Sequence, residues 1–189
     1  SVDGSVSPGP KRTWESEKFM TSLMGSAYSL KVPKIDRATL RTMIGLRKYI
    51  CSQFKPNVAK ALYDLFKVKN VMDFSMGWGD RLAGFFANMN TELYVGLDPR
   101  KENHPIYREQ ADYYESSLTL FETPKKVDFY CEAAEDFYYE DYEDTFDIIF
   151  TSPPYFNVER YSHDDTQSWV RYKDIDSWNS SFLHKALDN

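Results

Sequence analysis

The sequence predicts an α/β fold, in which a parallel β-sheet is covered by helices and preceded by a small helical region. From residue 70 onward, short apolar runs alternate with stretches of helical periodicity, as in chains that build parallel sheets. The first apolar run also ends in a glycine-rich turn that leads into a helical stretch. Before residue 70, apolar residues recur only at helical spacing, which indicates helices without strands.

The part before residue 70 divides into a tail and a helical region. Residues 1–12 are expected to form a flexible tail, because glycines and prolines interrupt a stretch that has little to bury. Residues 13–69 are expected to be helical and basic. A modest helical pattern covers 13–26, a second follows Asp36, a good N-cap residue, and a third starts at Pro56, which suits the first turn of a helix.

Residues 70–189 are expected to form one α/β domain. Its four strands are predicted at residues 71–74, 93–97, 127–131 and 146–150. Helices are predicted at residues 80–88, 103–120 and 133–137, and again toward the C-terminal end. The acidic stretch 138–144 is most simply a solvated loop.

Charge is unevenly distributed along the chain. The net charge of the 189 residues is −6, which alone argues against a protein that coats nucleic acid. Residues 1–70, however, hold 13 Lys and Arg against 5 Asp and Glu, whereas residues 71–189 hold 10 against 24. The helical half is therefore the better candidate for contact with a phosphate backbone.

Cysteine usage and hydropathy disfavour several classes of protein. Cys51 and Cys131 are isolated from each other and from the three histidines, so neither a disulfide framework nor a zinc site is expected. Cys131 is expected to be buried in a strand. No apolar run reaches the roughly 18 residues of a membrane-spanning helix, and the first residues do not resemble a signal peptide. We therefore expect a cytoplasmic protein without a metal.

The first candidate site is the turn after the first predicted strand, Asp73-Phe74-Ser75-Met76-Gly77-Trp78-Gly79. Its two glycines let the backbone approach a ligand, and the start of the next helix presents free N–H groups. A dinucleotide motif would need a third glycine three residues after Gly79, where the chain has Leu82. A nicotinamide or flavin dinucleotide is therefore disfavoured, and a turn without a ligand remains an alternative.

Two further carboxylates follow the next predicted strands. Asp98 ends the second strand, 25 residues after Asp73, and Glu132 ends the third. Because the carboxyl ends of parallel strands meet at one edge, we expect all three acids at the edge where open α/β folds bind ligands. A carboxylate in the position of Asp98 can accept two hydrogen bonds from a ribose diol. Taken singly, each acid could also be a solvated residue at a strand end.

The most specific signal is Thr151-Ser152-Pro153-Pro154-Tyr155, after the fourth predicted strand. Two successive prolines hold a loop extended and remove its N–H donors, so its carbonyl groups become fixed acceptors. Ser152 adds a side-chain acceptor, and Tyr155 adds an aromatic plane on which a base could stack. Such a loop suits an amino group as its ligand. The alternative is a rigid turn with a core aromatic residue.

With these motifs the chain resembles a known family, the S-adenosylmethionine-dependent DNA methyltransferases that modify exocyclic amino groups of adenine or cytosine. The segment 73–79 looks like the cofactor loop of that family, and 151–155 looks like its catalytic motif in the Ser-Pro-Pro-Tyr form. Phe54-Lys55-Pro56 resembles the motif that packs against the methionine end of the cofactor. The resemblance covers about residues 50–160 and implies a Rossmann-like class I methyltransferase sheet.

The resemblance also implies roles for the matching residues. The methionine moiety of S-adenosylmethionine would be held by Asp73 and by the backbone of Phe74, Ser75, Gly77 and Gly79, beside Phe54 and Pro56. Asp98 would bind the ribose hydroxyls, and Glu132 the adenine amino group. The target amino group would donate to Ser152 and to the carbonyl of Pro153 in the loop that Pro154 stiffens, and Tyr155 would stack on the target base.

Several alternatives stay open. RNA is an alternative to DNA as the substrate, and adenine and cytosine are both possible targets. A non-catalytic partner subunit that binds S-adenosylmethionine is the alternative from outside the enzymes.

The family's sheet has seven strands and four can be read here, so we expect the domain to be incomplete at its C-terminal end. A second copy or a partner chain is then expected to cover the open edge of the sheet. Arg160, Tyr161 and Arg171, after the Ser-Pro-Pro-Tyr loop, could contact a phosphate or simply lie on the surface.

Overall fold

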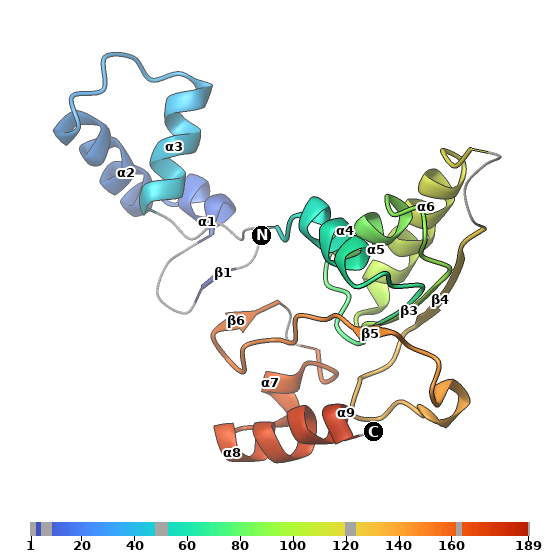
Figure 1. The fold of residues 1–189 in the computed structure, drawn as a ribbon. Coiled ribbons are helices and arrows are strands. Elements are labelled where there is room, and N and C mark those ends of the chain that lie inside the picture. The colour runs from blue at the N-terminus through green and yellow to red at the C-terminus, as the bar shows by residue number, and fades with distance from the viewer. Residues whose placement is uncertain (1–2, 5–8, 48–52, 120–123, 162–163, 189) are drawn as a thin grey trace. The chain divides into compact units, whose positions relative to one another are not determined.

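The fold is described from a computed structural model, shown in Figure 1. The structure describes residues 3–4, 9–47, 53–119, 124–161 and 164–188. The chain divides into two compact units. The first unit comprises residues 1–52 and 155–163, and the second comprises residues 53–154 and 164–189. Within the described residues, no helix combines the length and the apolar character that crossing a bilayer requires.

The first unit is a small helical unit with one short strand pair. Its elements are α1 (Pro10–Glu15), α2 (Glu17–Ser29), α3 (Arg37–Arg47), β1 (Asp3–Gly4) and β6 (Glu159–Arg160). The core between α2 and α3 is formed by Leu23, Ala27 and Met43. The expected tail of residues 1–12 therefore contains β1, which pairs with β6, and the start of α1. Pro10 suits that start because the first turn of a helix needs no N–H donor there.

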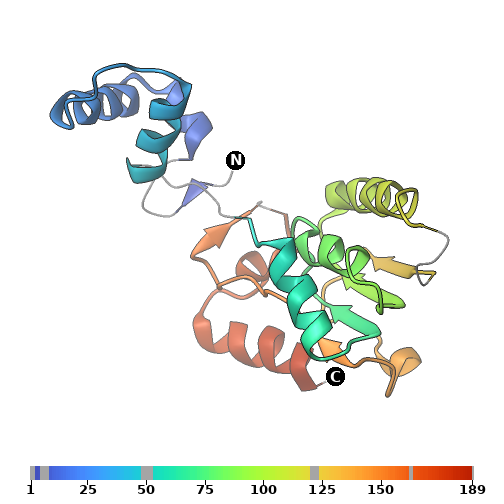
Figure 2. The same ribbon diagram turned by 45° about the horizontal axis from the view of Figure 1, so that its top comes forward.

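The second unit contains a four-stranded parallel sheet, so the predicted α/β fold is confirmed. Its strands are β2 (Asn70–Asp73), β3 (Leu93–Leu97), β4 (Lys126–Tyr130) and β5 (Ile148–Ile149), in the spatial order β4-β3-β2-β5. Helix α4 (Pro56–Leu65) precedes β2, α5 (Asp80–Phe86) connects β2 to β3, and α6 (His104–Glu115) lies between β3 and β4. These three helices lie together over one face of the sheet (Figures 1 and 2). The buried core below them includes Tyr63, Leu82, Phe85 and Tyr94.

The rest of the second unit departs from the predicted pattern. No regular helix forms over 133–137, and the acidic stretch holds the short helical turn η2 (Glu140–Tyr142). Another such turn, η1 (Lys101–Asn103), precedes α6, which ends at Glu115 rather than at 120. The C-terminal part is helical, as expected, but in short segments: α7 (Ser168–Arg171), α8 (Ile175–Trp178), the π-helical η3 (Asn179–His184) and α9 (Lys185–Asp188).

The last strand of the sheet, β5, is shorter than predicted because a side chain replaces part of its ladder. The Asp147 carboxylate accepts the N–H groups of Lys69 and Asn70, each at 2.8 Å, where a longer strand would use its backbone. The donations from Asn70 and Lys69 hold the pKa of Asp147 below its ordinary value. β5 is one of the two edge strands of the described sheet, β4 being the other, and Ile149 on β5 is 59% exposed. A partner chain at this edge stays a prediction.

The boundary between the units lies earlier than the expected residue 69, because α4 packs with the sheet. Gly84 of α5 lets α4 approach closely. A Cβ at this position would lie 2.6 Å from Cβ of Ala59 and 2.8 Å from the carbonyl oxygen of Pro56. Only a residue without a side chain fits between these two helices.

We expect Gly84→Ala to lower the free energy of unfolding by about 1–3 kcal/mol, because the added methyl group forces α4 away from α5. Gly25→Ala in α2 is the matched control, since nothing lies within 4 Å of the added Cβ. There the gain in helix propensity should stabilise the helix by about 0.5–1 kcal/mol. Urea unfolding of the two variants measures both effects, and a Gly84→Ala variant as stable as the parent would contradict the close packing.

Candidate functional site

The order of the strands creates one candidate ligand site in the sheet. β3 and β4 lie on one side of β2, and β5 lies on the other. The chain order therefore reverses between β2 and β5. In open α/β sheets, ligands bind outside the carboxyl ends of the strands at such a reversal. The glycine-rich loop leaves β2 at this point, and the Ser-Pro-Pro-Tyr loop leaves β5 beside it.

The strand registers bring several predicted site residues to the same level. Asp73 pairs with Gly96, so the residues two further along are Ser75 and Asp98. Met72 pairs with Ile149, so three residues further along Ser75 lies level with Ser152. Glu132 lies two residues beyond the end of β4 and is exposed. The carboxylates of Asp98 and Glu132 thus follow neighbouring strands at one edge of the sheet, as expected.

The glycine-rich loop turns sharply between β2 and α5. Gly77 and Gly79 have φ angles of +60° and +78°, in the left-handed region that glycine adopts at little cost. Phe74 and Met76 are buried beneath the loop, whereas Gly77 and Trp78 are exposed. A ligand at this edge would therefore meet the backbone around Gly77 rather than the side chain of Phe74.

Asp73 is held entirely inside the protein. Its side chain is 0% exposed, and it accepts hydrogen bonds from Arg81 Nε at 2.8 Å and Nη2 at 3.2 Å, and from Tyr94 Oη at 2.6 Å. The backbone N–H of Ser75 donates to the same carboxylate at 3.3 Å. This differs from the expectation that Asp73 holds the methionine moiety directly, because its oxygen atoms already face four protein donors.

Arg81, the partner of Asp73, lies outside the motifs described in the sequence. It is 4% exposed, and its Nη2 also donates to the carbonyl oxygen of Ser75 at 2.5 Å. Burial alone would lower the pKa of Arg81, but the Asp73 carboxylate outweighs burial and raises that pKa above its ordinary value. The one feature of the sequence that could have indicated the burial of Arg81 is its position beside Leu82, on a short helix that must bury most of its surface.

Asp98 is buried, and hydrogen bonds from three neighbouring groups orient its carboxylate. Its Oδ1 accepts the Arg100 N–H at 2.8 Å, and its Oδ2 accepts the Gly77 N–H at 3.2 Å and the Tyr107 hydroxyl at 3.0 Å. Burial raises the pKa of Asp98 above its ordinary value, against the opposing effect of these donors. The Tyr107 hydroxyl also lies 2.5 Å from the carbonyl oxygen of Gly77, so α6 ties the loop to β3.

The loop that carries Glu132 is anchored to the C-terminal helical segment. Glu135, 3% exposed, accepts hydrogen bonds from Arg171 Nη1 at 2.9 Å and from Tyr172 Oη at 3.1 Å. Arg171 also donates to Asp136 at 2.6 Å. Arg171 is exposed at the surface, one of its two expected roles, and its ion pairs anchor this loop; a phosphate contact by Arg171 stays a prediction.

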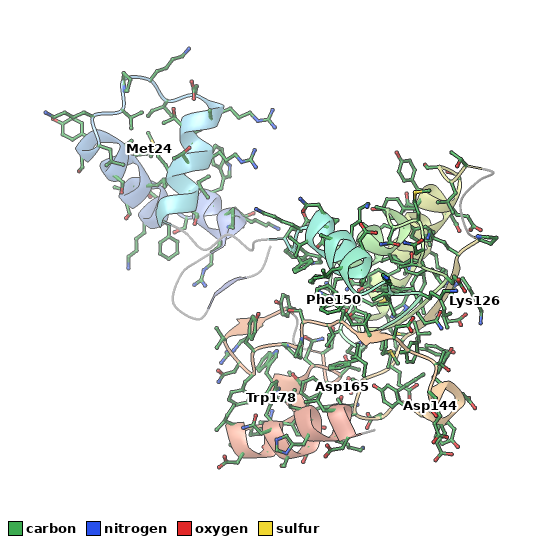
Figure 3. The ribbon with its side chains drawn as sticks, in the orientation of Figure 1. Met24, Lys126, Asp144, Phe150, Asp165 and Trp178 are labelled. Carbon is green, nitrogen blue, oxygen red and sulfur yellow. The ribbon has the colours of Figure 1, made fainter. Side chains whose placement is uncertain are left out.

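Phe54 connects the two loops of the candidate site. Its ring lies edge-on to Phe150 at a centroid distance of 5.7 Å, and the Arg81 guanidinium carbon lies 5.9 Å from its centroid. Tyr63 of α4 packs on Phe150 at 5.9 Å, and Figure 3 shows Phe150 below α4. Pro56 starts α4. Phe54 thus packs against Phe150, directly before the Ser-Pro-Pro-Tyr loop, and Pro56 positions the helix that follows it.

The Ser-Pro-Pro-Tyr loop is partly open to solvent. Ser152 is exposed, and Pro153 and Pro154 are half-buried. The Thr151 hydroxyl just before them is buried and makes no hydrogen bond to any residue that the structure describes. An unsatisfied buried hydroxyl costs free energy unless a ligand or water meets it. The loop therefore offers polar atoms beyond those its own fold uses.

Tyr155 lies at the division between the two units and is assigned to the first. Its side chain is 62% exposed, and its carbonyl oxygen accepts the Val158 N–H at 3.0 Å. Phe156, inside this turn, has φ of +49°, a conformation that is costly for a bulky residue. The ring of Tyr155 is therefore exposed at a turn of unusual backbone conformation.

Comparisons of the chain with protein-family models, curated proteins and solved structures give no match. The residues and their geometry therefore carry the inference of function.

Within the described part of the chain, no three His, Cys, Asp or Glu side chains are grouped to hold a metal ion. Cys131 is exposed, so the expectation of burial was wrong: β4 ends one residue earlier, at Tyr130. Cys51 lies outside the described residues.

Proposed function

We propose that the chain binds S-adenosylmethionine at the carboxyl edge of the sheet and transfers its methyl group to an exocyclic amino group of adenine or cytosine in DNA. The observation that carries the proposal is the adjacency of two loops. The glycine-rich loop leaves β2 and the Ser-Pro-Pro-Tyr loop leaves β5, and β2 and β5 are neighbours in register. A Rossmann-like class I methyltransferase sheet has its cofactor and catalytic loops in this relation.

The residues present fit this cofactor. The backbone at Gly77 is exposed and carries no Cβ, so a ligand can approach it closely. Asp98 Oδ1 accepts the N–H group of Arg100 and keeps acceptor capacity for a ribose hydroxyl. Glu132 is exposed at the same edge and can accept from an adenine amino group. Cofactor binding would supply the electrophilic methyl group.

The Ser-Pro-Pro-Tyr loop would activate the amino group by orienting it. The lone pair of an aromatic amine is delocalised into its ring, which makes the nitrogen a poor nucleophile. The Ser152 hydroxyl and the Pro153 carbonyl would each accept one N–H bond, in a geometry that suits a tetrahedral nitrogen. The lone pair would then be directed at the sulfonium methyl group: the N–C bond would form as the C–S bond breaks, the thioether would leave, and the nitrogen would release one proton to water. This displacement would need mainly positioning rather than a strong base. Tyr155 would stack on a base rotated out of the duplex.

Two measurements test the proposed function in order. Calorimetric titration of the chain with S-adenosylmethionine should show binding, and the absence of heat with folded protein would overturn the proposal. Transfer of labelled methyl groups to unmethylated duplex DNA should follow, with structured RNA as the parallel substrate. Binding without transfer to either polymer would favour the non-catalytic partner subunit. Mass spectrometry of the nucleosides then identifies the methylated base.

The first unit supplies a candidate surface for the DNA backbone. Residues 9–47 hold eight Lys and Arg against three Asp and Glu. On α3, Arg37 and Arg41 are exposed one turn apart, and Ala38 and Thr42 beside them are exposed and small. Lys34 in the preceding loop is also exposed. Cations beside small side chains allow close approach to a phosphate backbone.

We expect the double variant Arg37→Gln, Arg41→Gln to bind duplex DNA less tightly and with a weaker salt dependence. Each lost phosphate contact reduces the slope of log K against log salt by about 0.9, so the slope should fall by about 1–2. Fluorescence anisotropy over a salt series measures it. The control variant Arg108→Gln, Lys173→Gln removes the same charge from exposed positions of the second unit. An equal change in both variants would contradict a role for α3.

A further inference from the structure

We propose that Arg81 is the positioning residue of the cofactor loop, and that Asp73 acts through Arg81 without touching the cofactor. The inference rests on the proposed function, because it concerns the loop that would hold S-adenosylmethionine. It assigns a role to a residue outside the recognised motifs and changes the role that the motif implies for Asp73.

The first step is the arrangement of the guanidinium group. Arg81 Nε and Nη2 donate to the two oxygen atoms of Asp73, at 2.8 and 3.2 Å. Nη2 then reaches the carbonyl oxygen of Ser75 at 2.5 Å. The planar fork of arginine can serve a carboxylate and a carbonyl at once, whereas a lysine ammonium is a single point charge. One side chain therefore links the end of β2 to the loop.

The second step is what this link does for the loop. Ser75 is held on both sides, because its N–H donates to Asp73 at 3.3 Å while its carbonyl accepts from Arg81. The next N–H, that of Met76, donates to the Leu97 carbonyl at 3.0 Å. Beyond it the turn depends on Gly77 and Gly79, which have positive φ and the freedom of glycine. Asp98 and Tyr107 hold Gly77 on its far side, so the Arg81 link at Ser75 is one of the two anchors that place the exposed glycine backbone.

Third, in this arrangement Asp73 cannot contact a ligand directly. Its side chain is 0% exposed and lies below the loop, with Tyr94 Oη at 2.6 Å as a further donor. Replacing an ion pair buried this deeply by apolar packing often costs no stability, so net stability does not account for this pair; its proposed role is to fix one geometry of the loop. Such a pair serves orientation well.

The fourth step connects the same residue to the catalytic loop. The Arg81 guanidinium lies 5.9 Å from the centroid of Phe54, whose ring packs edge-on against Phe150. Phe150 immediately precedes the segment that contains Ser152. A single chain of contacts thus runs from the cofactor loop to the catalytic loop.

The test compares Arg81→Lys with Tyr94→Phe, which removes one donor from the same carboxylate but leaves the bond from Arg81 to Ser75. Amide hydrogen exchange without cofactor should rise about tenfold or more over residues 74–79 in Arg81→Lys, and stay within about twofold in Tyr94→Phe. The affinity for S-adenosylmethionine should fall about tenfold or more in Arg81→Lys only. Thermal unfolding of both variants shows how far each is destabilised.

Each outcome separates two explanations. If, in both variants, the affinity falls and the exchange rate rises in proportion to the loss of melting temperature, Arg81 is a stability residue and the proposal is overturned. If Arg81→Lys binds as tightly as the parent chain, the proposal is likewise overturned, while the proposed function stands. If the parent chain itself binds no S-adenosylmethionine, the proposed function fails, but the exchange measurement still decides whether Arg81 orders the loop.

Discussion

Pro153→Ala and Tyr155→Ala are each expected to abolish most methyl transfer while leaving the affinity for S-adenosylmethionine within about twofold of the parent chain. Pro153 presents a carbonyl acceptor in a loop whose extended backbone depends on two adjacent prolines. Loss of one oriented hydrogen-bond partner in a transition state lowers kcat by about 100-fold or more. Alanine keeps the carbonyl but frees φ, so we expect about a tenfold to 100-fold loss for Pro153→Ala.

The effect of Tyr155→Ala has a different physical origin. Stacking of one base on an aromatic ring contributes about 1–3 kcal/mol, so kcat/KM for DNA should fall by about 10- to 100-fold. Tyr113→Ala is the matched control, because Tyr113 is an exposed tyrosine, 69% against 62% for Tyr155, on α6. Transfer of labelled methyl groups measures all three variants. If Tyr155→Ala retains the parent rate, or Tyr113→Ala loses as much, the role of the loop is wrongly assigned.

Asp98→Ala is expected to lower the affinity for S-adenosylmethionine by about 100-fold. The carboxylate would accept the ribose hydroxyls, and hydrogen bonds to a charged group contribute about 1.5–3 kcal/mol each. The substitution also frees the N–H groups of Gly77 and Arg100, which Asp98 holds at 3.2 and 2.8 Å. Both effects weaken the site in the same direction.

Calorimetry measures this loss, and circular dichroism shows whether the variant is folded. Asp112→Ala is the control, since Asp112 is an exposed acid on α6. Asp98→Asn should be intermediate, because an amide keeps one acceptor but lacks the charge. Parent-like affinity in Asp98→Ala would remove the ribose contact from the proposal and leave the loop backbone as the main cofactor contact.

Strand positions were predictable because apolar runs are local features. The predicted strand over 93–97 matches β3, and the other predicted strands differ from β2, β4 and β5 by one to a few residues. The shared edge of Asp98 and Glu132 followed from parallel strands alone. The helix expected over 133–137 was wrong: the chain makes only a short turn there, and buried Glu135 pairs with Arg171, which is 36 residues away.

The sequence by itself determined the alternation that builds a parallel sheet, the acids at its carboxyl edge and the rigid Ser-Pro-Pro-Tyr loop. These features depend on residue type and spacing within a few positions. Only the tertiary structure decided that Asp73 is enclosed by Arg81 and Tyr94, that Phe54 lies between the two loops, and that α4 belongs with the sheet. Such pairings join residues far apart along the chain, and their energies depend on burial, which no local pattern specifies.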